Sequence, residues 1–200
     1  MLAASGAPQL APTLRTMSGD PTFAFLGCGN MGMAVLRGAL ASGALRADTT
    51  LVVEASAERR AQAQALGVRT SAGAAGAAGC TQFLLAVKPQ HFEALASELP
   101  AAPPLGDGSR LAISLMAGWS SESISSRLGD ARVVRTMPNL PAQVGRGVTA
   151  IAASILATPE DMALVERLFG GVGRTVRVRE DQLDAVTAIS GSGPAYLFLL

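Results

Sequence analysis

The stretch that decides the fold is FAFLGCGNMG at residues 23–32. Its first half is an apolar run typical of a buried strand, and its second half fits the pattern G-x-G-x-x-G. That pattern indicates a dinucleotide site when it joins a strand to a helix. Here the run Thr22–Leu26 precedes the turn and a helical pattern follows it over about Met31–Ser42. The stretch therefore predicts the first strand, turn and helix of a nucleotide-binding α/β fold.

Each glycine of this turn is expected to have a different structural role. Gly27 permits the tight turn, Gly29 lets the backbone approach a diphosphate, and Gly32 lets the helix lie against the strand. The helix N-terminus then offers free N–H groups and the positive end of its dipole to the phosphates. The alternative is a glycine-rich turn without a ligand. The coenzyme-binding residues predicted in the turn are Gly27, Cys28, Gly29, Asn30, Met31 and Gly32.

A second cluster of candidate residues follows the next predicted strand. Glu54 stands about 20 residues beyond Gly32, where an acid bonds the ribose 2′-hydroxyl of NAD. Ser56 is a further candidate, and Arg59 and Arg60 offer guanidinium groups to the 2′-phosphate of NADP, unless they form only the solvated face of a helix. A carboxylate repels that phosphate whereas guanidinium groups attract it, so the sequence leaves NAD(H) and NADP(H) both open.

The rest of the chain alternates short apolar runs with helical patterns. Strands are predicted at Thr50–Val53, Val68–Thr70, Gln82–Val87, Leu111–Leu115, Val133–Thr136 and Thr175–Val178. Helices are predicted at Ser56–Leu66, Pro89 to about Leu99, Ser121–Leu128 and Pro159–Phe169, with a small-residue helix at Ala72–Gly79 and a loop at Pro100–Gly108. Such alternation is typical of a parallel sheet covered on both faces. The prediction is an α/β, doubly wound, mainly parallel sheet of the Rossmann type.

Composition narrows the class of protein. The 200 residues are 49% hydrophobic and 16% charged, which indicates a globular chain. Sixteen basic against 15 acidic residues give a formal charge of +1, so the chain lacks the basic surplus of a nucleic-acid-binding protein. The two cysteines, Cys28 and Cys80, are too few for a disulfide scaffold and favour a reducing, cytoplasmic setting; both are interpreted as packing residues. No apolar run approaches the roughly 20 residues that span a bilayer.

Three regions are expected along the chain. Residues 1–20 lack periodicity and are interpreted as a flexible leader, with Met17 as an alternative start. Residues 21–182 form the nucleotide-binding domain. Residues 183–200 contain two helical patterns, Asp184–Ile189 and Pro194–Leu200, and the chain stops within an apolar run. We expect a second, helical domain to begin there and to be cut short; the alternative is a C-terminal helix packed into the core.

Four segments together resemble the pyrroline-5-carboxylate reductase family. They are FAFLGCGNMG at 23–32, LAVKPQ at 85–90, RTMPNLPAQVGRGVTA at 135–150 and DAVTAISGSGPAYLFLL at 184–200. The segments follow the family's order and spacing. The chain departs from the family at Leu140, where threonine is usual, and at Met116 and Trp119, which stand in a stretch of smaller residues.

The resemblance implies NAD(P)H-dependent hydride transfer to the imine carbon of 1-pyrroline-5-carboxylate, which gives L-proline in the last step of proline biosynthesis. This chemistry needs positioning of two small molecules rather than a nucleophile or a metal. The resemblance also implies a homo-oligomer formed through the helical domain, which supplies much of the substrate pocket. We therefore expect the chain alone to bind nucleotide with weak or no reductase activity.

Further site residues follow from the resemblance. The loop Ala86–Pro89 lines the nicotinamide in this family, and Lys88 could draw in the substrate carboxylate or merely pack the loop. Asn139 is expected to border the nicotinamide and substrate pocket, with a purely structural turn as the alternative, and His91 is interpreted as a surface residue. The additional coenzyme-binding candidates are Glu54, Ser56, Ala86, Val87, Lys88 and Pro89. Lys88 and Asn139 are candidates for the pocket, and no catalytic residue or metal ligand is assigned.

Two other functions stay open on the sequence alone. The chain could be a non-catalytic nucleotide-binding fragment. It could also be a related coenzyme-F420/NADP-linked or imine reductase, because the Gly27–Met31 pattern is shared with those enzymes.

Overall fold

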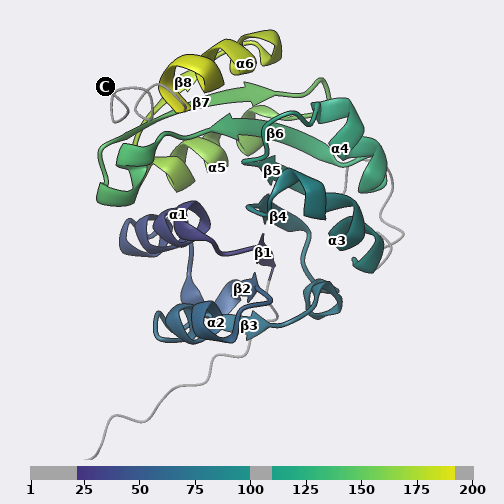
Figure 1. Ribbon diagram of the computed structural model, residues 1–200, viewed down its shortest axis with the longest axis vertical. Coiled ribbons are helices and arrows are strands. Elements are labelled where there is room, and N and C mark those ends of the chain that lie inside the picture. The colour runs from purple at the N-terminus through teal and green to yellow at the C-terminus, as the bar shows by residue number, and fades with distance from the viewer. Residues whose placement is uncertain (1–21, 100–109, 192–200) are drawn as a thin grey trace, which may run out of the picture.

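A computed structural model describes residues 22–99 and 110–191 and shows the predicted α/β architecture (Figure 1). The strands are β1 (Phe23–Leu26), β2 (Thr50–Val53), β3 (Arg69–Ser71), β4 (Gln82–Leu85), β5 (Leu111–Ser114), β6 (Arg132–Met137), β7 (Gly147–Ala153) and β8 (Gly173–Arg177). The α-helices are α1 (Asn30–Ala41), α2 (Ala57–Gln64), α3 (Phe92–Glu98), α4 (Ser121–Arg127), α5 (Pro159–Gly170) and α6 (Leu183–Val186). The predicted leader, the loop Pro100–Gly108 and the helix Pro194–Leu200 lie outside the described residues.

One sheet carries all eight strands, in the order β3-β2-β1-β4-β5-β6-β7-β8. The strands from β3 to β6 in this order are parallel, β7 is antiparallel to β6, and β8 is parallel to β7. The prediction of a doubly wound, mainly parallel sheet is confirmed. Strand β7 was not predicted, and it is the element that reverses the direction of the sheet.

Three strand ends define the part of the sheet that matters for a ligand. In the register of β1, Leu26 lies beside Val53 of β2 and Leu85 of β4. The chain leaves β1 toward α1 on one face, whereas it enters α3 on the other face after β4. This is the topological switch point of an open α/β sheet, outside which such folds bind ligands.

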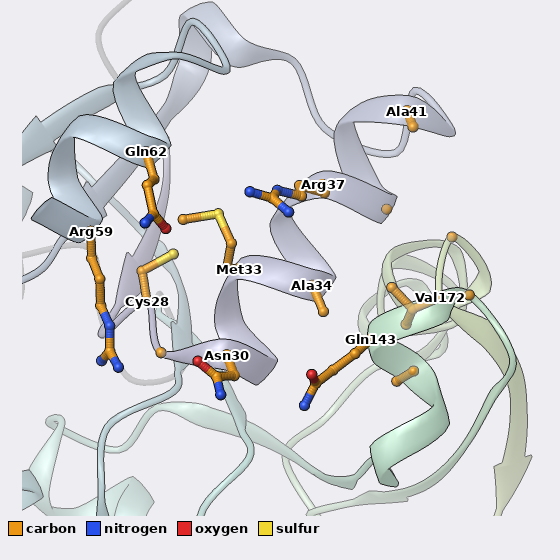
Figure 2. A pocket seen from close by; sticks show the side chains of 15 residues that line it. Cys28, Asn30, Met33, Ala34, Arg37, Ala41, Arg59, Gln62, Gln143 and Val172 are labelled. Atoms are coloured by element: carbon orange, nitrogen blue, oxygen red, sulfur yellow. The ribbon is translucent and has the colours of Figure 1, made fainter.

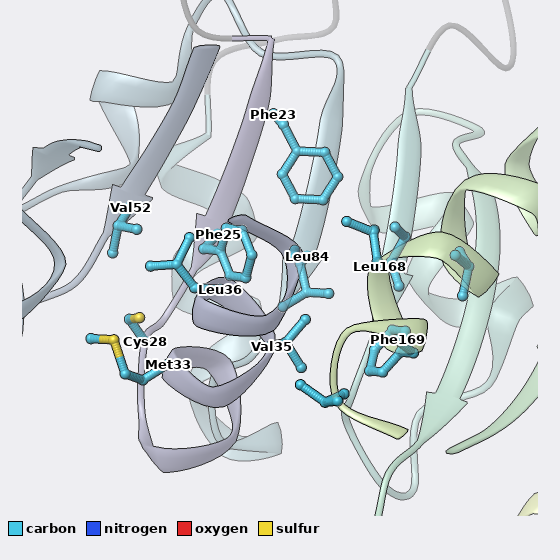
Figure 3. Packing of buried hydrophobic residues seen from close by; sticks show 14 of the residues in the cluster. Phe23, Phe25, Cys28, Met33, Val35, Leu36, Val52, Leu84, Leu168 and Phe169 are labelled. Atoms are coloured by element: carbon cyan, nitrogen blue, oxygen red, sulfur yellow. The ribbon is translucent and has the colours of Figure 1, made fainter. Parts of the chain in front are cut away.

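The core consists of two apolar layers, one on each face of the sheet. On the first face α1 and α5 lie side by side, and Phe25 of β1 packs with Leu36 and Leu168 (Figures 1 and 3). On the second face α3 and α4 cover Phe83 of β4, and Phe92 of α3 is fully buried there. The strands follow the period-2 alternation that sends neighbouring residues to opposite faces.

Helix α1 approaches the turn after α5 without intervening side chains. A Cβ atom built on Gly38 would lie 2.7 Å from the carbonyl oxygen of Gly171 and 2.6 Å from Cγ1 of Val172. Both distances are shorter than a carbon atom tolerates, so only glycine fits at position 38. The amino-terminal half of the sheet is therefore joined to the β7–β8 half through backbone contact.

The segment after β8 is attached by an ion pair and a small apolar cluster. Leu183 of α6 packs on Met137, Ala150 and Ala152 of β6 and β7. Glu180 accepts hydrogen bonds from the backbone N–H of Ser121, at 2.7 Å, and from Nη1 of Arg135, at 3.1 Å. The Arg135 side chain is only 8% exposed, and its Nε finds no acceptor among the described residues.

Two predicted helices differ in form from the expectation. The Ala72–Gly79 segment, predicted as a helix, forms only a single 3-10 turn, Ala74–Ala77, whose Ala74 and Ala77 are buried against the sheet. Repeated glycines explain this, because each one weakens a helix by about 1 kcal/mol relative to alanine. The predicted helix Asp184–Ile189 is α6 continued by a π-helical turn, Thr187–Gly191.

Candidate coenzyme site

The glycine turn lies directly against the end of β4. Gly27 has φ +86°, and a Cβ atom at this position would lie 2.9 Å from the carbonyl oxygen of Ala86. A Cβ atom on Gly32 would lie 3.2 Å from Cβ of Ala86. The two glycines therefore allow β1, α1 and β4 to meet, which is the packing that the sequence pattern predicted.

The amino terminus of α1 is open toward this turn. Gly29 is its N-cap residue, and none of the described side chains caps the helix. The first intrahelical bond runs from the N–H of Met33 to the carbonyl of Gly29, so the N–H groups of Asn30, Met31 and Gly32 have no partner inside the helix. Gly29 also has free space, because the nearest atom to a Cβ built there is Nη1 of Arg59, at 3.7 Å. Open N–H groups beside an open glycine form an anion cradle.

Glu54 joins the turn to the start of α2. One carboxylate oxygen accepts a hydrogen bond from the backbone N–H of Cys28, at 2.8 Å. The other oxygen accepts from the backbone N–H of Ser56, at 2.9 Å. The carboxylate is thus fixed in place at the carboxyl end of β2, between the two loops that the sequence assigned to the coenzyme.

The two arginines of α2 have different surroundings. Nη1 of Arg60 donates to the carbonyl oxygens of Glu54 and Ala55, both at 2.7 Å, so this nitrogen of the guanidinium is engaged by its own chain. Arg59 is exposed and extends alongside Cys28 and Asn30 of the turn (Figure 2). The side chain of Ser56 accepts from the N–H of Arg59, at 3.4 Å, and so caps α2.

A cavity of about 740 Å³ opens at these strand ends. The predicted residues that line it are Gly27, Gly29, Asn30, Glu54, Arg59, Ala86, Val87 and Lys88, and the structure adds His91, Leu95 and others. A neighbouring cavity of about 460 Å³ lies on the far side of the turn, where Cys28, Arg37 and Gln143 line it (Figure 2). Arg59 lines both cavities. The predicted residues Met31, Gly32, Ser56, Pro89 and Asn139 line neither.

Cys28 has the surroundings of a packing residue. Its side chain is buried in the core beside Met33 (Figure 3). Burial first, and then the negative charge of Glu54, raise the pKa of the thiol to about 11. The thiol therefore stays protonated near neutral pH, where it is a poor nucleophile.

Trp119 holds the loop that carries Lys88, a contact that the sequence did not predict. Its Nε1–H donates to the carbonyl oxygen of Pro89, at 3.2 Å, and its ring meets Phe92 edge-on at 4.9 Å. The guanidinium of Arg127 lies over the same ring. Only the departure from the resembled family at Trp119 marked this position in the sequence.

We expect Trp119→Phe to lower the free energy of unfolding by about 1 kcal/mol, because the ring contacts persist while the half-buried carbonyl of Pro89 loses its donor. Coenzyme binding should weaken about threefold, since a looser Pro89 leaves Lys88 less well placed. Urea denaturation and calorimetric titration measure the two effects. Unchanged values for both would contradict this role of Trp119.

Asn139 connects two elements instead of facing either cavity. Its Oδ1 accepts from the N–H of Val148, at 2.9 Å, and its Nδ2 donates to Oγ of Ser190, at 3.2 Å. Ser190 belongs to the π-helical turn, a type of helix distortion frequent at functional sites. The amide therefore joins the start of β7 to the π-helical turn Thr187–Gly191.

Two kinds of site are absent from the part of the chain that the structure describes. Residues 22–99 and 110–191 contain no group of three or more histidine, cysteine or acidic side chains that could hold a metal ion. In the same ranges no helix has the length and apolarity to cross a membrane.

Comparisons with known proteins agree with this architecture. Residues 22–118 match the family model for NADP oxidoreductase, coenzyme F420-dependent. A pyrroline-5-carboxylate reductase from Synechocystis is 38% identical over 88% of this chain and 65% of its own. The chain thus spans about two thirds of the length of the curated relatives it matches.

Solved structures give the same result. A pyrroline-5-carboxylate reductase from Coxiella burnetii superposes with a TM-score of 0.80 at 32% identity, over 90% of this chain and 67% of that one. A pyrroline carboxylate reductase from Plasmodium falciparum, solved with NADP bound, gives a TM-score of 0.74 at 25% identity, over 90% of this chain and 65% of that one. By the identity and coverage of these matches, the chain belongs to the pyrroline-5-carboxylate reductase family.

Proposed function

We propose that the protein binds NAD(P)H in the 740 Å³ cavity and acts as a pyrroline-5-carboxylate reductase that forms L-proline. The observation that carries the proposal is the anion cradle at Gly29, which opens at the switch point of the sheet. Family membership supports the choice of substrate. When bound, the reduced nicotinamide would supply a hydride to C5 of the protonated imine, which would reduce the C=N double bond to the C–N single bond of proline and leave the oxidised coenzyme.

The residues of the chain would bind and orient the reactants. The N–H groups of Asn30, Met31 and Gly32 would hold the diphosphate, and Glu54 would accept from the ribose. Lys88 is exposed at the rim of the cavity, where its ammonium group would attract the substrate carboxylate. Because binding would already restrict the translation and rotation of both molecules, the chemical step would no longer carry that entropic cost.

The proposal extends to organisation and location. Residues 21–182 would form the coenzyme domain, and residues from 183 onward would begin a helical region through which the reductase forms a homo-oligomer. The near-zero net charge and the two buried cysteines support a cytoplasmic protein without a nucleic-acid partner. The substrate pair would be 1-pyrroline-5-carboxylate and L-proline.

Two glycine-to-alanine variants, Gly29→Ala and Gly170→Ala, distinguish an effect on coenzyme binding from an effect on stability. In Gly29→Ala the new methyl group meets only the end of Arg59, so stability should stay within about 0.5 kcal/mol, but the methyl fills the anion cradle. We expect calorimetric affinity for NAD(P)H to fall at least about tenfold. Gly170→Ala, where a Cβ atom meets nothing within 4 Å, is the control that should change neither value.

Activity is measured as coenzyme oxidation with 1-pyrroline-5-carboxylate and with other imines. Oxidation only with 1-pyrroline-5-carboxylate supports the proposal. Preference for another imine would favour a related reductase. Turnover by the chain alone is expected to be weak, because the helical domain is expected to supply much of the substrate pocket, but coenzyme binding with no detectable turnover of any imine would favour a non-catalytic fragment. Failure of the unaltered chain to bind either coenzyme would refute the proposal.

A further inference from the structure

We infer that the cavity selects NADH over NADPH and that Glu54 is the residue that determines this specificity. The inference rests on the proposed function and adds the choice of coenzyme to it. The name of the matching family model and the NADP-bound relative point the other way, so the argument depends on this chain's own contacts.

The first step is that the Glu54 carboxylate is held rigidly. Its two oxygens accept backbone N–H groups from two different segments, Cys28 of the turn and Ser56 before α2. Hydrogen bonds to an ionised carboxylate are stronger than those between neutral groups. Rotation of the side chain away from the cavity would break both bonds and leave two N–H groups without partners. The negative charge therefore cannot move aside for a ligand.

The fixed carboxylate also lies where the ribose of a bound coenzyme is expected. Glu54 follows β2 and lines the cavity, at the position where nucleotide-binding sheets place the adenosine ribose. A carboxylate has about four acceptor positions, and two remain after the backbone bonds are made. Those two suit the hydroxyl groups of the ribose in NADH. The 2′-phosphate of NADPH would bring a like charge to the same place and have no hydrogen to donate.

The third step is that the nearby arginines do not offset Glu54. Arg60 donates from Nη1 to two backbone carbonyls, so this part of the guanidinium faces its own chain. Nη1 of Arg59 lies 3.7 Å from the Cβ position of Gly29, which places it over the diphosphate cradle. The other basic or acidic residues of the cavity are Lys88 and His91, in the segment between β4 and α3, and Glu98 of α3, all of which follow β4 rather than β2.

The test is calorimetric titration of the whole chain with NADH and with NADPH at one ionic strength. We expect NADH to bind at least about tenfold more tightly, as a fixed like charge a few ångströms from a phosphate implies. In Glu54→Gln this preference should fall at least about tenfold, through weaker NADH and stronger NADPH binding. Glu58→Gln is the matched control, since it removes an exposed carboxylate of α2, four residues from Glu54, that lines neither cavity, and it should leave the preference unchanged.

Arg59→Gln decides between the two candidate roles of Arg59. A diphosphate contact predicts that both coenzymes weaken by the same factor, whereas selective loss of NADPH binding would make Arg59 the partner of the 2′-phosphate and overturn the inference. Equal or tighter binding of NADPH by the unaltered chain would also overturn it, even if Glu54→Gln failed to fold. Absence of binding by both coenzymes would instead refute the proposed function.

Discussion

Replacing Gly27 with alanine should abolish coenzyme binding and lower the free energy of unfolding by about 3 kcal/mol. Two effects add. The φ of +86° costs a residue with a side chain about 1–2 kcal/mol. The new methyl group would also lie 2.9 Å from both the carbonyl oxygen of Ala86 and Cγ1 of Val87, so the turn must move away from β4. That movement carries the open N–H groups of α1 out of the cavity.

Gly43→Ala separates these effects. Gly43 also has a positive φ, of +73°, but a Cβ atom built there meets nothing within 4 Å. We expect a loss of about 1 kcal/mol and unchanged coenzyme affinity. Urea denaturation and titration with NADH give both quantities for each variant. Equal losses of stability in the two variants would show that contact with β4 contributes nothing, and retained binding in Gly27→Ala would contradict the assigned role of the turn.

The second large effect is expected for Glu180→Ala, which should lower the free energy of unfolding by about 2–3 kcal/mol. The substitution removes the carboxylate that accepts from buried Arg135 and from the N–H of Ser121. Arg135 would be left charged and buried without its ion-pair partner, which costs more than the pair itself contributes. The neighbouring variant Asp181→Ala breaks the exposed pair with Arg179 and should lower the free energy of unfolding far less than Glu180→Ala does.

The pH dependence of this effect has a definite sign. Burial alone would raise the pKa of Glu180, but the hydrogen bonds from Ser121 and the charge of Arg135 outweigh burial and hold the pKa below its ordinary value. A lowered pKa means that Glu180 stabilises the protein fully above about pH 4.5 and loses this contribution as the pH falls further. The difference between the native chain and Glu180→Ala in urea denaturation should therefore shrink as the pH falls below about 4.5. A difference that stayed constant would show that the carboxylate charge is unimportant.

The amino-terminal half of the fold was predictable because each element there has a local signal. The apolar run before Gly27 marks β1, the glycines mark the turn, and Ser56 caps α2 as its residue type suggests. Strand β7 gave no such signal. Its sequence GVTAIAA is rich in small residues, and a short 3-10 helix, Leu140–Val144, links it to β6. Pairing with β6 and β8, rather than propensity, makes this segment a strand.

The sequence predicted which residues belong to the candidate site, but not the hydrogen bonds that fix them in place. Spacing alone placed Glu54 near the coenzyme, and the sheet order then brought it into one cavity with Gly27 and Lys88. One of the two bonds that fix its carboxylate joins residues 26 positions apart, and the bond from Trp119 to Pro89 spans 30 positions. No local pattern encodes contacts of this range, because they depend on how the loops pack after the sheet has formed.

The backbones of Gly38 and Gly171 lie in direct contact, and neither residue has a side chain. No change of rotamer at these two residues can therefore accommodate movement between α1 and the far half of the sheet. The helix consequently has one axial setting, fixed about two turns from its amino terminus. A tilt of α1 at Gly38 would displace the N–H groups at its amino terminus, and with them the anion cradle. The close packing of Gly38 against Gly171, although it lies away from the candidate site, thus determines the orientation in which α1 presents that site to the coenzyme.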